Sequence, residues 1–489
     1  MLNLTGRRSA AGGGVVLIVR FGLGAVLNYG FGVALAWLLS PAEFGAVSVL
    51  QNVQFLCAMV LSAGFPWVLA ATVAREPDPR VVAATYRAAF LGNLVLGVVL
   101  AAGFGAAQLA WSVLPAAQAA TAACVTAMIV VLSLTSALGG GLQGERRFDG
   151  YGVMQISEIA IKVAVSVLVV GVLGYGVTGV AVSFLVGAML SSVIGVLALR
   201  DRLPGRGPVA WRRTGTRAVA TGLASSAFGA ILAVDVIALS VVGRGHGVTA
   251  AGIALYQAAT VLARAPFFVA DALSNAVFPF VARARTAAEV DGWFRAAFRW
   301  IPLALLPLQL VLLIAPAPVL RVLFPPHYAQ ADGALRILTV GTAGLIALDV
   351  LLKTLNAREI RAVARWVPAA LAVEAVALAV LVPRLGITGA ALAFTIGTWA
   401  GALALARIYA RAHRPLWVGR GTVARYLLAL LPLTALLLVA ARLSGLAAPA
   451  MIAAGLACYA AAVLRLRLLR EQDLQRVAGA LRRNRVVQS

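Results

Sequence analysis

The segment Gly176-Val-Thr-Gly-Val-Ala-Val-Ser-Phe-Leu-Val-Gly187 returns 210 residues later as Gly386-Ile-Thr-Gly-Ala-Ala-Leu-Ala-Phe-Thr-Ile-Gly397. The two copies align without a gap and share six of their twelve positions. A repeat at a fixed long spacing indicates duplicated architecture, and in a membrane chain it is typical of a transporter built from two similar halves. Each copy begins with Gly-x-Thr-Gly, in which glycine allows the positive φ of a tight turn between two membrane spans.

The composition of the chain predicts a membrane protein. Hydrophobic residues make up 62% of its 489 residues and charged residues only 12%, about half of the roughly 25% found in soluble domains. Long apolar runs separated by short charged links predict an all-α polytopic membrane protein. A membrane β-barrel would show alternating hydrophobicity instead. The composition therefore excludes a soluble globular protein.

The net charge of +24 is explained by membrane topology rather than by binding to nucleic acid. Most of the 41 Lys and Arg residues lie in alternate links between the apolar runs and in the two termini, which is the pattern of cytoplasmic loops. It predicts a multi-pass protein of the bacterial cytoplasmic (inner) membrane with both termini inside, and basic arms that attract membrane lipids. The arginines on the predicted outer side are Arg244, Arg321, Arg384 and Arg442.

With about 20 apolar residues per span, the sequence predicts fourteen transmembrane helices. Six form an N-terminal lobe (1–200), a charged, Pro- and Gly-rich cytoplasmic linker follows (201–217), and six more form a C-terminal lobe (218–411). Two additional helices (412–464) and a basic cytoplasmic tail (465–489) complete the chain. The repeated segment falls on the outer turn before the last span of each lobe, so the lobes are predicted to be pseudo-symmetric and to share one orientation.

No cofactor or metal site is expected. Cys57, Cys124 and Cys458 lie in apolar runs and are interpreted as small core residues, and the three histidines are isolated from one another. The sequence has no phosphate-binding P-loop, so direct use of ATP is not indicated. A proton or sodium gradient is the alternative source of energy.

Short motifs beside the spans resemble those of one transporter family. They are Leu38-Leu-Ser-Pro-Ala-Glu-Phe-Gly45, Gly64-Phe-Pro66, Leu323-Phe-Pro-Pro-His-Tyr328, Leu355-Asn-Ala357 and Arg384-Leu-Gly-Ile-Thr-Gly-Ala-Ala391. With them the chain resembles the polysaccharide flippases of the multidrug/oligosaccharidyl-lipid/polysaccharide (MOP) exporter superfamily. The resemblance implies two six-helix lobes around a central cleft, undecaprenyl-pyrophosphate-linked oligosaccharides as substrates, polysaccharide-assembly proteins as partners, and alternating access without covalent chemistry.

Arginines inside spans are the sharpest candidates for binding a charged headgroup. Arg264 lies well inside the predicted span 251–281, where a charge costs about 2.5–3.5 kcal/mol on insertion scales. A guanidinium binds a diphosphate through paired hydrogen bonds, and the alternative is a structural ion pair with Asp235. The resemblance implies arginines on the first and eighth spans that face the pyrophosphate, which points to Arg20 and Arg264. Arg20 is also close enough to the membrane surface to snorkel there.

Two i,i+4 pairs contain the only lysines of the chain. Glu158 precedes Lys162, and Asp349 precedes Lys353, at the spacing that places both side chains on one helix face. Each pair is interpreted either as structural neutralisation or as part of a proton or sodium relay or a gate.

Further polar residues in predicted spans are candidates for structural neutralisation, for a charge relay or gate, or for sugar recognition. Asp235 lies at a depth similar to that of Arg264, Asp271 shares a helix face with Arg264, and Glu374 has no charged neighbour in sequence. All three are candidates for charge relay or gating. Amides suit sugars, but they equally suit hydrogen bonds between helices. The candidates for substrate binding are Asn28, Asn52 and Gln257, with Tyr29, Gln51, Gln54 and Asn275 as further members of the polar set.

Other functions share some of these features. A cation-coupled multidrug exporter of the same fold would use the intramembrane carboxylates. The sequence also does not separate a peptidoglycan-precursor (lipid II) flippase from one that serves exopolysaccharide, capsule or O-antigen (lipopolysaccharide) biosynthesis. A membrane glycan polymerase or ligase would need a large outer loop with catalytic groups, whereas the longest outer link (321–332) has no nucleophile–base set. The chain is therefore not expected to be an enzyme.

Overall fold

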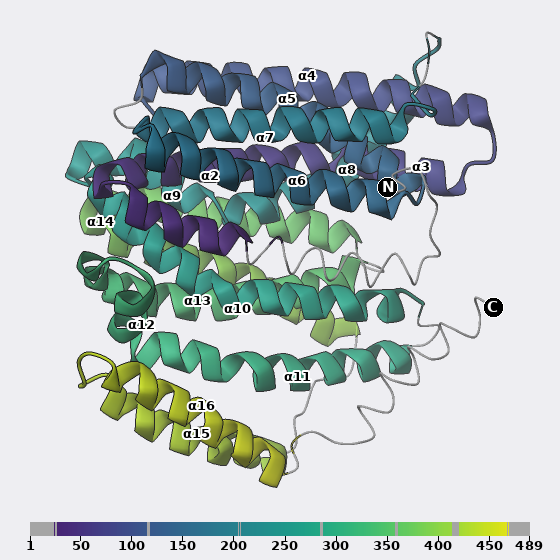
Figure 1. The fold of residues 1–489 in the computed structure, drawn as a ribbon. Helices are drawn as coiled ribbons and strands as arrows, with labels where there is room; N and C mark the ends of the chain where they lie inside the picture. The colour runs from purple at the N-terminus through teal and green to yellow at the C-terminus, as the bar shows by residue number, and fades with distance from the viewer. Residues whose placement is uncertain are drawn as a thin grey trace. The chain divides into compact units, whose positions relative to one another are not determined.

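The computed structural model describes residues 24, 27–114, 118–203, 205, 207–283, 287–356, 360–412, 420–466 and 468. Within these ranges most residues are helical and no strand occurs (Figure 1). Ten described helices are long and apolar enough to cross a membrane, or twelve if each of two bent pairs counts as one span. The all-α membrane fold is thus confirmed, whereas the described residues do not confirm fourteen spans.

The first half of the chain is a series of long helices joined by short links. Within the predicted first span, the structure describes residue 24 and a short apolar helix, Leu27–Leu38. The following elements are α2 (Pro41–Ala63), α3 (Phe65–Arg75), α4 (Pro79–Trp111), α5 (Ala119–Gly144), α6 (Phe148–Ser166), its π-helical extension η1 (Val167–Val172) and α7 (Gly176–Leu199).

The second half begins with a broken helix and ends with a helix pair. Its elements are α8 (Trp211–Ile231), α9 (Val234–Ala238), η2 (Leu239–Gly243), η3 (Arg244–His246), α10 (Ala250–Arg283), α11 (Ala287–Ile314), α12 (Pro316–Leu323), η4 (Pro326–Ala331), α13 (Asp332–Asn356), α14 (Ile360–Ala412), α15 (Arg420–Ala440) and α16 (Ala447–Arg465).

Two predicted spans that the sequence presents as continuous apolar runs are bent. The predicted span 218–242 bends by 60° after α8, and 298–320 bends by 92° between α11 and α12. Pro316 begins α12, which fits the preference of proline for the first position of a helix. The two residues between α8 and α9, Leu232 and Ala233, are neither proline nor glycine, so the apolar run did not reveal the first bend.

Both copies of the repeated segment turn at their first glycine, as predicted. Gly176 has a φ of +47° and begins α7, and Gly386 has a φ of +55° inside the range of α14. A non-glycine residue would be strained in this left-handed region. Gly386 therefore divides α14 into two helices, which explains why one element extends over two predicted spans.

The chain divides into two compact units. The first comprises Met1–Ala254 with Leu378–Ala390, and the second comprises Leu255–Ala377 with Ala391–Ser489. In the first unit α5 packs between α4 and α7, and α6 packs against α7 (Figure 1). In the second unit α15 and α16 pack against each other and against α11 through an apolar core that includes Leu433. The predicted lobe boundaries stay predictions.

Candidate functional site

The first compact unit contains a buried lysine, Lys162. Lys162 of α6 donates a hydrogen bond from Nζ to Asn28 Oδ1 at 2.9 Å. Its ammonium also lies 4.9 Å from the ring centroid of Phe184 and 5.5 Å from that of Phe31. Glu158, one turn earlier on α6, interacts with it electrostatically. The structure thus brings Lys162 together with the predicted substrate-binding residue Asn28 and with two aromatic faces that stabilise a cation.

The repeated segment creates this arrangement. Phe184 and Gly187 both belong to its first copy, on α7. A Cβ at Gly187 would lie 2.9 Å from the backbone oxygen of Glu158 and 3.4 Å from Lys162 Cβ. The glycine therefore lets α6 approach α7 closely. Sequence reasoning selected the cation but not its aromatic neighbour, although the recurrence of phenylalanine in both copies was the available signal.

Arg264 occupies a comparable position in the second compact unit. It is 6% exposed, and its guanidinium carbon lies 4.8 Å from the ring centroid of Phe394. Phe394 is the counterpart of Phe184 in the second copy of the repeat. Gly397, the counterpart of Gly187, lies against Glu374, because a Cβ at Gly397 would be 2.5 Å from Glu374 Cβ. Each copy of the repeat therefore presents its phenylalanine to a buried cation.

A three-residue charge cluster joins α10 and α13 in the second unit. Lys353 Nζ forms ion pairs with Asp271 Oδ1 on α10 and, at 2.8 Å, with Asp349 Oδ2 one turn earlier on α13. The exposed fractions are 37% for Asp271, 17% for Lys353 and 2% for Asp349. Two carboxylates thus share one ammonium, and the more exposed carboxylate lies at one end. The i,i+4 spacing revealed one of the two ion pairs but could not reveal the one that crosses between helices.

The remaining predicted site residues lie in different surroundings. Asn52 is buried and donates from Nδ2 to Ser48 O of its own helix at 2.8 Å. Gln257 of α10 is buried. Asp235 is fully buried just after the bend that follows α8, where Oδ1 accepts a hydrogen bond from Val236 N. Arg20 and the side chain of Asn275 lie outside the described residues, and the proposed Asp235–Arg264 pair stays a prediction.

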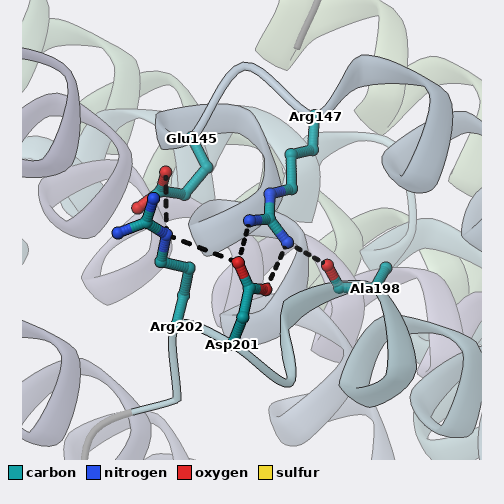
Figure 2. Close-up of polar contacts among 5 residues, drawn as sticks. All are labelled: Glu145, Arg147, Ala198, Asp201 and Arg202. Atoms are coloured by element: carbon teal, nitrogen blue, oxygen red, sulfur yellow. Dashed lines mark hydrogen bonds and ion pairs between the residues drawn. The ribbon is translucent and has the colours of Figure 1, made fainter. Parts of the chain in front are cut away.

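A second charge cluster, which sequence reasoning did not identify, ties the α5–α6 link to the end of α7 (Figure 2). The guanidinium of Arg147 donates to Ala198 O at 2.6 Å and, with both terminal nitrogens, to the Asp201 carboxylate. Arg202 lies 3.7 Å from Glu145 and 3.6 Å from Asp201. The hydrogen bonds from Arg147 lower the pKa of Asp201 from 3.8 to about 2. This cluster fixes the point where the predicted linker leaves the first half.

Metal binding has no evident site in the part of the chain that the structure describes. In those ranges no group of three or more His, Cys, Asp or Glu side chains could hold a metal ion. Cys57 is buried, Cys124 is half-buried and Cys458 is exposed, and all three thiols are free.

Comparison with known proteins gives one sequence match and several structural ones. A family profile described as "Polysaccharide biosynthesis protein" matches residues 34–331. No curated protein matches the chain in sequence.

Three solved transporters of similar fold illustrate the structural matches. The lipid II flippase MurJ in an inward closed conformation has a TM-score of 0.72 and 13% identity over 93% of this chain and 99% of its own. An inward-facing multidrug resistance MATE family transporter of the MOP superfamily gives 0.62 and 17% over 80% and 94%. A MOP superfamily transporter from Pyrococcus furiosus, described as having a binding pocket of reversed polarity, gives 0.58 and 16% over 84% and 96%.

Proposed function

Because the chain belongs to the polysaccharide biosynthesis protein family and has the fold of MOP-superfamily transporters, we propose that it is a flippase for a polyprenyl-pyrophosphate-linked oligosaccharide. It would carry this lipid across the bacterial cytoplasmic membrane by alternating access, in exopolysaccharide, capsule or O-antigen biosynthesis. The reaction makes and breaks no covalent bond, so the protein needs binding groups rather than a catalytic set. Its partners would be the lipid-linked glycan, membrane lipids and polysaccharide-assembly proteins.

The buried position of Arg264 is the observation that carries this proposal. Arg264 is 6% exposed in an apolar helix, and its guanidinium carbon lies over the Phe394 ring. Retaining a full charge there is costly, so an intramembrane arginine is by default a functional residue. A guanidinium that lies over a ring keeps its N–H donors at its edge, where they suit the paired oxygens of a diphosphate. A pyrophosphate headgroup is thus the ligand best suited to this residue.

The charge cluster of Asp271, Lys353 and Asp349 supports a second candidate function. Two carboxylates with one ammonium leave a net negative charge when all three are ionised. A proton or a sodium ion would neutralise that charge, which favours coupling to an ion gradient. A cation-coupled multidrug exporter would need the same feature, and the MATE transporters share the fold. The similarity to MurJ adds a lipid II flippase as a further alternative.

Purified protein in liposomes tests the proposal directly. We expect Arg264→Ala to reduce translocation of a fluorescent polyprenyl-pyrophosphate glycan at least about tenfold, the loss that corresponds to about 1.4 kcal/mol of headgroup contact, without changing membrane insertion. Arg365→Ala is the matched control, because Arg365 also lies over an aromatic ring, Trp366, but is exposed.

The substrate alternatives are separated in the same liposomes. A wild-type protein that moves lipid II or a cationic drug but not the oligosaccharide lipid would replace the proposed substrate. Full translocation of the oligosaccharide lipid by Arg264→Ala would remove Arg264 from the site.

A further inference from the structure

The second helix of α14, which follows the turn at Gly386, packs one of its turns against a buried cation and a buried carboxylate. Phe394 lies under the guanidinium of Arg264, and a Cβ at Gly397, three residues later, would lie 2.5 Å from Cβ and 3.2 Å from Cγ of Glu374. Arg264 is 6% exposed and Glu374 is 0% exposed. Side chains three residues apart on a helix are neighbours, with Cβ atoms about 5–6 Å apart. The two opposite charges therefore belong to residues that contact the same face of this helix.

Contacts with α13 hold this turn of α14 in place. Thr395 Oγ1 donates to Ile337 O at 3.1 Å, and Thr398 Oγ1 donates to Gly341 O at 3.0 Å. A Cβ at Gly341 would lie 2.7 Å from Phe394 Cδ1, so the aromatic ring packs directly on the backbone of α13. The turn is therefore a fixed support for both buried charges, and all of these residues belong to the second compact unit.

The first copy of the repeat shows the same relation between its phenylalanine, its glycine and two charges. Phe184 faces the ammonium of Lys162, and Gly187 packs against the stretch of α6 that carries Lys162 and Glu158. Lys162 and Glu158 interact electrostatically. In both compact units, the repeated phenylalanine thus contacts a cation and the repeated glycine contacts a segment with a carboxylate. In the first unit one helix supplies both charges, whereas in the second α10 supplies the cation and α14 the carboxylate.

We propose that Glu374 is the counter-charge of Arg264 and the residue that sets the affinity of this site for a diphosphate. The proposal rests on the transport function proposed above. A buried ion is stable only when an opposite charge lies near it, and the pair makes the empty site neutral. A diphosphate that binds the donors of Arg264 also meets the negative charge of Glu374, and like charges brought together weaken binding. A carrier needs such a limit on affinity, because it must release its cargo on the far side of the membrane.

A double-mutant cycle of thermal unfolding in detergent tests the pair without any ligand. Arg264→Met and Glu374→Gln each leave one buried charge without its counter-charge, so we expect each protein to unfold at least about 5 °C below the wild type. The double variant should recover at least about half of that loss, because it buries neither charge. A single variant that does not fold is scored by whether the double variant folds. Additive losses, or a recovery of Arg264→Met by Asp235→Asn instead, would overturn the proposal.

Calorimetric titration of the purified protein with inorganic pyrophosphate tests the effect on affinity. We expect Glu374→Gln to bind pyrophosphate at least about tenfold more tightly than the wild type, which corresponds to about 1.4 kcal/mol of removed repulsion, and Arg264→Met to lose this binding. Tighter binding is a gain that damage to the structure would not produce. Asp332→Asn is the matched control, because it removes a carboxylate at the start of α13 in the same unit. An unchanged affinity in Glu374→Gln would overturn the proposal.

The two experiments separate this proposal from the function on which it rests. Pyrophosphate binding that depends on Arg264 but not on Glu374 would keep the headgroup site and remove the role of Glu374. A coupled unfolding cycle without pyrophosphate binding by either the wild type or Glu374→Gln would remove the headgroup site. The role of Glu374 in affinity would fall with it, and the charge pair would remain as a structural one.

Discussion

Phe184 and Phe394 occupy one position of the repeated segment, and each lies against a buried cation. The first cation is the ammonium of Lys162 on α6, and the second is the guanidinium of Arg264 on α10. An aromatic face offsets part of the cost of taking a cation out of water. The ammonium of Lys162 is a compact charge that also donates to Asn28, whereas the guanidinium of Arg264 keeps donors at its edge. The position of Arg264 beside Phe394 is therefore better suited to a diphosphate than the position of Lys162 beside Phe184.

A double-mutant cycle at Lys162 and Phe184 measures how far the ring supports the charge. We expect Phe184→Leu to destabilise the protein more when Lys162 is present than in a Lys162→Met background, because methionine carries no charge to support. The coupling free energy should be about 0.5–2 kcal/mol, obtained from thermal unfolding in detergent. Phe104→Leu, a buried phenylalanine of α4, is the control for loss of packing alone. A coupling near zero would leave the ring as packing only.

The ion pair between Arg147 and Asp201 predicts a loss of stability in acid. The folded-state pKa of Asp201, about 2, lies below its usual value of 3.8. The stability that the ion pair contributes is therefore fully present above the unfolded-state pKa and is lost as the pH falls toward the folded-state pKa. The unfolding temperature of the wild type should therefore fall between about pH 4.5 and about pH 2.5 more steeply than that of Asp201→Asn. Equal slopes for the two proteins would show that this carboxylate contributes nothing measurable.

At the scale of elements, glycines decide which helices pack closely. A Cβ at Gly140 of α5 would lie 2.5 Å from Pro66 O and 2.7 Å from Pro66 Cα of α3. One turn later, a Cβ at Gly144 would lie 2.8 Å from Val73 Cβ and 3.1 Å from Ala70 Cα. Small residues four apart on one face let two membrane helices approach to backbone contact. The α3–α5 contact therefore depends on glycine at both positions.

Gly140→Val tests this helix contact. The added side chain meets backbone atoms that cannot rotate away, so overpacking should destabilise the protein by about 1–3 kcal/mol or prevent folding. Gly105→Val on α4 is the control, because a Cβ there meets nothing within 4 Å. Thermal unfolding and gel filtration in detergent measure the result. An unfolding temperature for Gly140→Val as high as that of the control would mean that α3 can shift without cost.

The sequence predicted some elements well and others poorly, for physical reasons. The length of an apolar run predicts a membrane helix because the thickness of the bilayer sets that length. Gly176 and Gly386 predicted the turns at their positions because glycine is favoured at positive φ. The bend after Ile231 had no such marker, and apolar length does not report it. The sequence pattern did not predict the π-helical segments η1 and η2 either, since they differ from an α-helix only in hydrogen-bond register.

At the scale of the whole molecule, intramembrane charge predicted the candidate residues, but not their partners. Lys162, Arg264 and Lys353 were selected because charges in apolar runs are rare. Helical spacing reports neighbours on one helix only, so it gave Asp349 as a partner of Lys353 and missed Asp271. It likewise missed the bond from Lys162 to Asn28, which are 134 residues apart in sequence. Partners that lie far apart in sequence are decided by packing, which no short-range pattern records.

The charge cluster of Asp271, Lys353 and Asp349 then predicts how transport responds to an ion gradient. If the excess carboxylate binds the coupling cation, Asp271→Asn leaves a neutral pair of Lys353 and Asp349 that no longer needs one. We expect liposomes with Asp271→Asn to move substrate at the same rate with and without an imposed proton or sodium gradient, whereas the wild type is stimulated. Asp332→Asn, at the start of the same helix α13, is the control and should keep the stimulation. Stimulation that survives in Asp271→Asn would make the cluster a structural link between α10 and α13.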